Sequence, residues 1–590
     1  MIRLRFLLPA AICLIVPVAS VRSAPAPTER SGLEQVPATA PIVLYLRGVQ
    51  GTHDRFVTMM ENALPDVLKK IQPDMDNFLK DGSEGRKLRG LAKNGPHFIA
   101  VTELPKANGP FPDPPPVALI LAVTDYKAFR DNILTEGERK DIKDKGNGIE
   151  SATFEGKTTY FVDRKGFAIV TPNEEVANSF TKKQTGLNTA MSKEVAAKLL
   201  ASDAGLYVNM DAVNKEYGEQ IKQGKEAVEQ MLAPLGQIGD ESQKKFVEMF
   251  TKAIGPIFQT VEDMHSVLAT VEFRPGGLAL HLEGEVNENT TTSNLLKDSR
   301  PVPFKELERL PADRTYYVAM KASAALYKNL GSLVSGLPNV DTKDAVTLME
   351  ELAKAGPDIA VGGGSFPIAG LNVYQYDDPA KAVAATLKMY RNMDPKISNL
   401  MEKPVVKKDA EKHGDFKLHF AQLAYDFDKM AEPIAQKGEA AKKQYIESMK
   451  GMLGEKTNVW FGTDGKTVVQ INAPDWPSAR KMLDQFTKGA ETVGDLKAFR
   501  AARKEMPART SFLGLIDAVQ MFGTIMEVVK PLIPAGQIPP GWPNLPPKGT
   551  SSFVGMAVTL QPLRGGFDLF ITAAAAQEFY KAAVKPLVGG

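Results

Sequence analysis

A short phrase that recurs four times constrains the fold of this chain more than any other feature. In each occurrence a turn, usually containing Pro or Ala, leads into an apolar strand and then toward a helix. The four stretches are 36–46, 200–210, 310–320 and 506–516. Such self-similarity is the mark of repeated structural units. The 590 residues, enough for about four domains, are therefore predicted to form four modules.

The four modules pair into two halves. Residues 273–280 contain a strand, a turn with two adjacent glycines and a second strand, and residues 560–569 repeat this pattern. We therefore expect two duplicated halves, 37–298 and 305–588. The predicted divisions are a leader at 1–23, linkers at 24–36 and 299–306, and modules at 37–198, 199–298, 307–498 and 499–590, the third related to the first and the fourth to the second.

Within a module, strands and helices follow one another in an order that favours antiparallel pairing. In the first module a strand at 42–46 precedes helices between 54 and 92. Strands at 98–103 and 117–123 and a helix at 126–134 follow. This order predicts an α+β fold, made of tandem duplicated modules of antiparallel sheet with helices packed on one face, in a ferredoxin-like manner.

Two of the expected strands have contrasting patterns. Residues 117–123 are apolar throughout, which predicts a central strand buried on both faces. Residues 278–283 read Leu-Ala-Leu-His-Leu-Glu. This alternation predicts that the leucines face the core and that His281 and Glu283 face water.

The N-terminus has the features of an export signal. Arg3 and Arg5 precede an apolar run from Phe6 to Ser20, which is too short for a comfortable membrane span. We predict cleavage near Ser23 and an extracytoplasmic protein, periplasmic or secreted, with no integral membrane domain after cleavage. Retention of the leader as an anchor is the alternative.

Composition excludes several kinds of chemistry. The single cysteine, Cys13, lies in the leader, so the mature chain forms neither disulfides nor thiolate metal sites. Lys and Arg total 72 against 70 Asp and Glu, so no charge excess draws the protein to a nucleic acid.

No group of residues has the spacing of a catalytic, cofactor-binding or metal site. His413 and His419 would lie about 20 Å apart on one extended strand, and His281 and His419 are predicted to be exposed on strands. There is no GxSxG element. The glycines at 362–364 lack a following GK[ST] element and predict a flexible or bulged strand connection. We therefore assign no catalytic, cofactor-binding or metal-binding residue.

Several polar residues stand where a strand ends and a helix begins. Such positions favour residues whose side chains accept hydrogen bonds from the first turn of the helix. We predict helix caps, and not catalytic carboxylates, in the stretches 123–129, 170–177, 376–383 and 472–479, and further caps at Ser192 and Ser242.

Two proline-rich segments are the best candidates for contact with a protein partner. They are 104–116, which contains Phe111, and 534–547, which contains Trp542, and both are predicted to be exposed loops. Helices with an apolar stripe, such as 342–356, either line a lipid groove or pack on the sheet. Packing on the sheet is the simpler interpretation.

The leader, followed by modules that open with Pro-Ala-Asp and a tyrosine-rich strand as at 310–318, resembles large secreted bacterial proteins of unknown function with repeated sheet-plus-helix modules. These families have no assigned activity, so the resemblance implies no functional residue. The sequence favours a non-enzymatic binding or scaffold protein that needs no cofactor. The alternatives are a carrier of a lipid or another apolar ligand, and a hydrolase whose site is assembled from distant segments.

Overall fold

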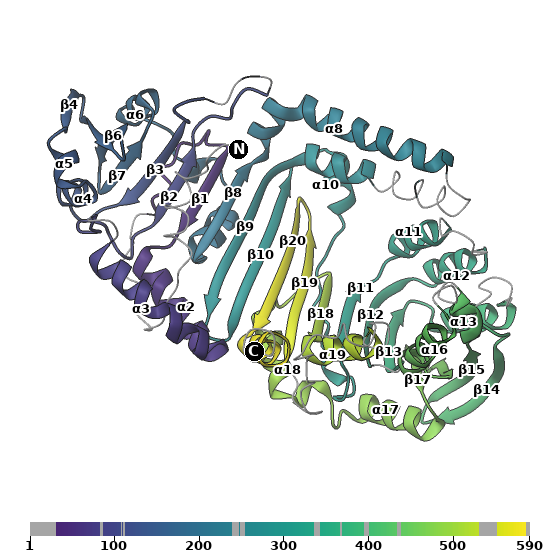
Figure 1. Ribbon diagram of the computed structural model, residues 1–590. Helices are drawn as coiled ribbons and strands as arrows, with labels where there is room; N and C mark the ends of the chain where they lie inside the picture. Colours follow the sequence, from purple (N-terminus) through teal and green to yellow (C-terminus); the bar gives the residue numbers. More distant parts are fainter. Residues whose placement is uncertain are drawn as a thin grey trace. The chain divides into compact units, whose positions relative to one another are not determined.

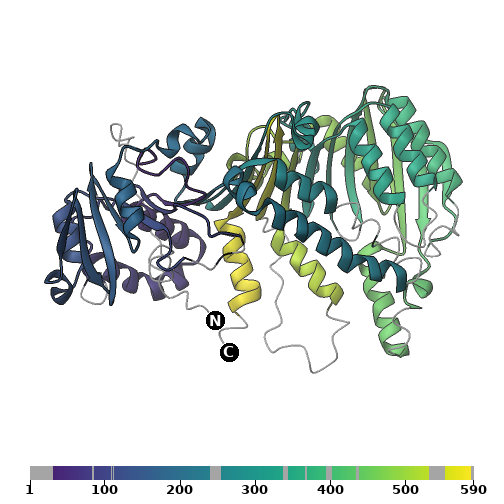
Figure 2. The same cartoon turned by 90° about the horizontal axis from the view of Figure 1, so that it is seen from above.

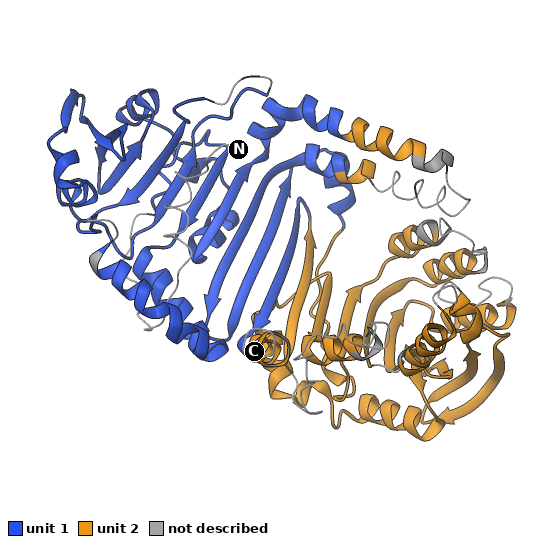
Figure 3. Ribbon diagram, in the orientation of Figure 1, with its two compact units in different colours: residues 1–224, 258–298, 562–573 blue, residues 225–257, 299–561, 574–590 orange. Residues whose placement is uncertain are grey.

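The chain divides into two compact units in a computed structural model (Figure 3). Unit 1 contains residues 1–224, 258–298 and 562–573, and unit 2 contains residues 225–257, 299–561 and 574–590. The structure describes residues 31–82, 86–107, 109, 112–238, 247, 254–335, 343–365, 368–393, 401–432, 438–529 and 552–585. The predicted leader and the proline-rich segment 534–547 lie outside the described residues.

The described part of unit 1 contains eleven strands that pair antiparallel (Figure 1). Their order is β4-β5-β6-β7-β3-β2-β1-β8-β9-β10-β20. The strands are β1 (Ile42–Leu46), β2 (His97–Val101), β3 (Val117–Ala122), β4 (Lys143–Gly146), β5 (Ile149–Phe154), β6 (Lys157–Arg164), β7 (Phe167–Thr171), β8 (Ala204–Asn209), β9 (Met264–Arg274), β10 (Gly277–Val286) and β20 (Arg564–Thr572). Unit 1 is therefore completed by a strand from the far end of the chain.

Helices lie against both faces of this sheet (Figure 1; Figure 2 gives the view from above). On one face, residues 33–40, α6 and α7 close the main core, which includes Phe98, Ile120 and Tyr207. On the other face, α4 packs over β3 and β7, and α2 and α3 pack near Phe273 and Leu278. The helices of unit 1 are α2 (Val49–Ala63), α3 (Pro65–Asp81), α4 (Tyr126–Ile133), α5 (Glu136–Arg139), α6 (Glu174–Thr181), α7 (Lys193–Ala201) and α10 (Thr291–Leu296); α8 (Met210–Ile238) crosses the division between the units.

The described part of unit 2 contains nine strands that pair antiparallel in the order β14-β15-β16-β17-β13-β12-β11-β18-β19. The strands are β11 (Tyr316–Lys321), β12 (Pro357–Ser365), β13 (Ala369–Tyr376), β14 (Val405–His413), β15 (Phe416–Ala424), β16 (Lys456–Thr463), β17 (Thr467–Ala473), β18 (Phe512–Asp517) and β19 (Phe553–Gln561). Each occupies the place that the strand numbered ten lower has in unit 1.

The helices of unit 2 surround a core of their own. They are α11 (Ala324–Ser335), α12 (Lys343–Lys354), α13 (Pro379–Asn392), α14 (Phe427–Met430), α16 (Glu439–Leu453), α17 (Trp476–Lys488), α18 (Lys497–Glu505) and α19 (Ala518–Val529), and α20 (Ala573–Phe579) begins at the division. The stripe of α12 packs into this core through Leu348 and Leu352, as the simpler interpretation predicted. The fold is α+β with antiparallel sheets, as predicted.

Two glycine-containing segments differ from their predictions. The glycines at 362–364 lie inside β12, paired on both sides, and do not form a flexible connection. A Cβ atom on Gly362 would lie 2.2 Å from Oδ1 of Asn372, and one on Gly364 would lie 2.4 Å from the Tyr316 hydroxyl, so a larger residue would force these side chains to shift. In the segment 560–569 the turn is Pro562-Leu563, and the two glycines belong to β20.

The predicted helix caps among the described residues are confirmed, and Ser242 lies outside those residues. Side-chain oxygens of Asp125, Asn173, Asp378 and Asp475 accept hydrogen bonds from backbone N–H groups in the first turns of α4, α6, α13 and α17. Ser192 does the same for α7 through the N–H of Val195. These groups are therefore engaged in holding helix ends.

Loss of the α6 cap should cost measurable stability. Asn173 accepts hydrogen bonds from the N–H groups of Glu175 at 2.9 Å and Val176 at 3.1 Å. We expect Asn173→Ala to lower the free energy of unfolding by about 1 kcal/mol in urea denaturation. Asn173→Asp keeps the acceptor and should lose much less; equal losses in the two variants would contradict the capping role.

Candidate functional site

One face of the unit 1 sheet carries two neighbouring rows of mostly apolar side chains. In the first row, each residue pairs with the next one across two neighbouring strands. The row consists of Phe161, Val170, Leu119, Ile99, Leu44, Leu206, Ala269, Leu282 and Phe567. The second row contains Leu121, His97, Leu46, Ala204, Val271 and Leu280. Because strands lie about 4.8 Å apart, the first row extends roughly 38 Å across the sheet.

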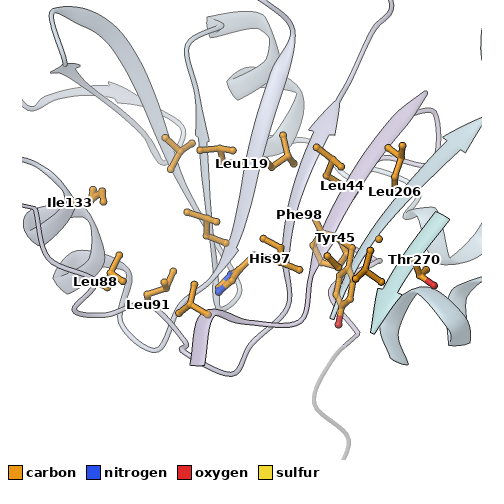
Figure 4. Close-up of a pocket in the computed structure, with 18 of the residues that line it drawn as sticks. Leu44, Tyr45, Leu88, Leu91, His97, Phe98, Leu119, Ile133, Leu206 and Thr270 are labelled. Atoms are coloured by element: carbon orange, nitrogen blue, oxygen red, sulfur yellow. The ribbon is translucent and has the colours of Figure 1, made fainter. Parts of the chain in front are cut away.

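The two rows form the floor of a groove with a cavity volume of about 950 Å³ (Figure 4). Val49 of α2 and Phe78 of α3 contribute to its lining, and Phe129 and Ile133 of α4 contribute from another part of the same face. This volume is near the upper end of the range of roughly 300–1,000 Å³ that is usual for ligand pockets.

Large apolar side chains of the floor remain exposed to solvent. Leu44 is 42% exposed, Leu282 is 48% exposed and Phe567 is 40% exposed. Single exposed apolar residues are common, but a continuous apolar surface of this kind marks a site of interaction. The open floor indicates that an apolar ligand can cover these side chains.

Few polar groups interrupt the lining. His97 is 4% exposed, and its Nδ1 accepts a hydrogen bond from the Ala122 N–H at 3.2 Å. Burial lowers the pKa of His97 to about 4, so its ring is neutral at pH 7. Arg86 donates two hydrogen bonds to Glu138, at 2.7 and 2.9 Å, and its guanidinium lies 4.2 Å from the centre of the Phe154 ring.

The opposite face of β10 and β20 carries a partly buried cluster of charges. His281 Nδ1 lies 2.7 Å from Oδ1 of Asp568, and its Nε2 lies 3.5 Å from Oε2 of Glu283, which Lys198 of α7 also contacts. Burial alone would lower the pKa of His281, but hydrogen bonds with Asp568 and Glu283 raise it to about 9. Burial alone would raise the pKa of Glu283, but its bonds with His281 and Lys198 lower it to about 2.

A neighbouring group extends this cluster along β20. The Arg564 guanidinium lies 2.8 Å from Oε1 of Glu285 on β10 and 3.2 Å from Oε2 of Glu194 on α7. Charges of opposite sign thus join β10, β20 and α7. We call these seven residues the charge cluster; they are Glu194, Lys198, His281, Glu283, Glu285, Arg564 and Asp568.

The predicted orientation of β10 is wrong. Glu283 is 6% exposed and lies in the charge cluster, whereas Leu282 is 48% exposed and faces the groove. The predicted exposure of the strand histidines is wrong as well, since the side chains of His281 and His419 are only 15% and 10% exposed. His419 is buried because its Nδ1 accepts a hydrogen bond from the Asp409 N–H at 2.9 Å and its ring packs on Phe461.

The prediction that residues 117–123 are buried on both faces of the sheet is right for one face only. The other face lines the groove. Ala118, Ile120 and Ala122 of β3 are buried in the core, whereas Leu119 and Leu121 are half-buried and line the groove. An apolar residue at every position was therefore the sequence signal for a second apolar environment. Sequence reasoning missed the groove because it interpreted this run only as deep burial.

Three further histidines each lie close to a carboxylate. His53, His265 and His413 contact Asp76, Asp211 and Asp484, respectively. In the described part of the chain, no three His, Cys, Asp or Glu side chains are grouped as a metal ion would require. In the same part, no helix is both long enough and apolar enough to cross a membrane.

The first proline-rich segment is partly attached to α8. The Pro105 carbonyl accepts a hydrogen bond from the Tyr217 hydroxyl at 2.7 Å, and the Ala107 N–H donates one to Glu216 at 3.0 Å. Phe111, like Trp542 of the second segment, lies outside the described residues.

Comparison with known proteins adds little to these observations. No protein-family model and no curated protein matches the chain. Among solved structures, a chain described as "Structure of crystal form III of TP0453" is similar at 11% identity over 46% of this chain and 87% of that chain, with a TM-score of 0.22. A likeness at this score supports no statement about the present chain.

Proposed function

We propose that unit 1 binds an elongated apolar ligand, such as the acyl chain of a lipid, and carries it outside the cytoplasm. The observation that carries this proposal is the groove, whose volume is about 950 Å³ and whose floor leaves Leu44 and Leu282 exposed. The stretch of the first row from Leu44 to Phe567, which contains its exposed side chains, spans roughly 19 Å, and a compact metabolite would leave most of it uncovered. A hydrocarbon chain laid across the strands would cover it.

The energetics of burial are adequate for a reversible complex. Each buried methylene contributes about 0.8 kcal/mol, so a chain of about 16 carbons gains roughly 13 kcal/mol when it is fully covered. Association costs an estimated 4–15 kcal/mol in lost freedom of motion. Binding is therefore favourable where the cost of association lies below roughly 13 kcal/mol.

Two sequence-based proposals complete this function. The order of nine strands that both units share supports the duplication of 37–298 and 305–588. The charged and apolar pattern of residues 1–23 supports export. A scaffold role through the proline-rich loops has less support, because residues 105 and 107 are held against α8.

Native mass spectrometry and a fluorescent probe test the proposal together. We expect the freshly purified protein to retain a lipid that organic extraction removes. The extracted protein should then bind N-phenyl-1-naphthylamine with increased fluorescence, and methyl palmitate should displace this probe. Absence of both a retained ligand and probe binding would contradict the proposal.

A further inference from the structure

The one polar ring in the floor of the groove is placed among leucines. His97 stands on β2 between Leu121 of β3 and Leu46 of β1, in the second row of the floor. Figure 4 shows its ring among the side chains that line the cavity, and 96% of the residue is buried. A polar side chain at such a position costs free energy unless its hydrogen bonds are made.

The hydrogen bonding of His97 leaves one donor without a partner. Because Nδ1 accepts the hydrogen bond from the Ala122 N–H, the neutral ring carries its proton on Nε2. Nε2 is buried and has no hydrogen-bond partner among the described residues. Native proteins seldom leave a buried donor unused, so this one calls for an acceptor from elsewhere.

The charges of the lining indicate what kind of acceptor fits. The Arg86 guanidinium donates two hydrogen bonds to the Glu138 carboxylate and one to the Ile133 carbonyl, and Glu155 adds a negative charge 3.9 Å from it. A bound carboxylate would therefore find no uncompensated cation among the described lining residues. An uncharged oxygen would meet no such penalty.

We propose that the ligand of the groove is a neutral lipid with a carbonyl oxygen, such as an acyl ester, and that His97 Nε2 donates a hydrogen bond to this oxygen. This inference rests on the proposed function and specifies its ligand. His97 would fix the position of the ester along the row, while the apolar floor binds the hydrocarbon chain without regard to its position.

Three probes of equal chain length test the inference by displacement of N-phenyl-1-naphthylamine at pH 7. They are methyl palmitate, which has the ester carbonyl, hexadecane, which has no acceptor, and palmitate, which is charged. We expect the protein to bind methyl palmitate about tenfold more tightly than hexadecane, as one satisfied buried hydrogen bond implies. Palmitate should bind more weakly than its methyl ester.

Two variants show whether His97 is responsible. His97→Phe keeps an aromatic ring but removes the donor, and it should reduce the ratio of ester affinity to hydrocarbon affinity to about one. His97→Gln can both accept and donate, and it should keep part of the preference. Because the ratio is taken within each variant, any change in the free protein affects both probes equally.

The outcomes separate this inference from the proposed function. Equal binding of methyl palmitate and hexadecane to the unsubstituted protein, or an unchanged ratio in His97→Phe, would overturn the inference and leave the apolar carrier intact. Tighter binding of palmitate than of its ester would also overturn it. Failure of all three probes to bind would overturn the proposed function as well.

Discussion

Leu44→Asp abolishes displacement of N-phenyl-1-naphthylamine by methyl palmitate and leaves the protein folded. Leu44 lies at the centre of the first row, between Ile99 and Leu206, and is 42% exposed. The new carboxylate therefore stays hydrated in the free protein. When a hydrocarbon chain covers it, the carboxylate must lose water without gaining a partner, which costs several kcal/mol and reduces affinity about 100-fold or more.

A matched substitution outside the groove controls for nonspecific effects of charge. Leu295 of α10 belongs to the same unit and is 75% exposed. We expect Leu295→Asp to bind the probe and methyl palmitate like the unsubstituted protein. Far-UV circular dichroism and thermal unfolding should be unchanged in both variants. Equal loss of binding in the two variants would contradict the assignment of the groove, as would full binding by a folded Leu44→Asp protein.

Asp568→Asn lowers the stability of unit 1 by up to about 3 kcal/mol near pH 6, because it removes one of the two carboxylates that keep His281 charged. The shift in the pKa of His281 from 6.5 to about 9 sets the upper limit of this effect. At 1.36 kcal/mol per unit of pKa, that limit is about 3 kcal/mol. Since the two units can unfold in separate transitions, hydrogen exchange of the β10 amides is the appropriate readout.

The pH dependence of this stability follows from the directions of the two shifts. The raised pKa of His281 gives a contribution that is complete below pH 6.5 and is lost as the pH rises through about 9. The lowered pKa of Glu283 gives one that is complete above pH 4.5 and is lost as the pH falls through about 2. Protection of β10 should therefore be greatest between roughly pH 4.5 and 6.5.

A second aspartate serves as the control for this series. Asp141 is an exposed residue of the same unit. Asp141→Asn should leave both the exchange rates and their pH dependence unchanged, whereas Asp568→Asn should flatten the alkaline decline. An alkaline decline of the same size in Asp568→Asn and in the unsubstituted protein would show that His281 does not depend on this carboxylate.

Local features of the fold were predictable because nearby residues determine them. The strand expected at 42–46 is β1, and the helix expected at 126–134 is α4. Asn173 and Asp475 cap helices as predicted, since a cap requires only a suitable side chain three residues or fewer before its partner.

Features that depend on distant residues were not predictable in the same way. The alternation of β10 distinguishes two faces, but which face is buried depends on Lys198 and Asp568, which are 83 and 287 residues away from His281. The strands β20 and β10, which pair in unit 1, are also far apart in the sequence. A single sequence shows that His281 and Glu283 share a face and does not show the charges that cover it.

The groove was predictable in part. Leu119 and Leu121 indicate a second apolar surface on β3. This signal is local, because it needs only the residues of one strand. That this surface remains open, with Leu44 and Leu282 exposed, results from where α2, α3 and α4 pack on the sheet. The sequence therefore indicates that the floor is apolar, but it does not indicate that the floor is accessible to a ligand.

Photochemical crosslinking tests the central claim most directly. A methyl palmitate analogue with a diazirine on its hydrocarbon chain would be bound to the protein, irradiated and located by peptide mass spectrometry. We predict adducts on β1, β2, β8 and β10, at or next to Leu44, Ile99, Leu206 and Leu282, and their loss in the presence of excess methyl palmitate. Adducts confined to unit 2, or spread over the chain and unaffected by the competitor, would contradict a lipid-binding groove in unit 1.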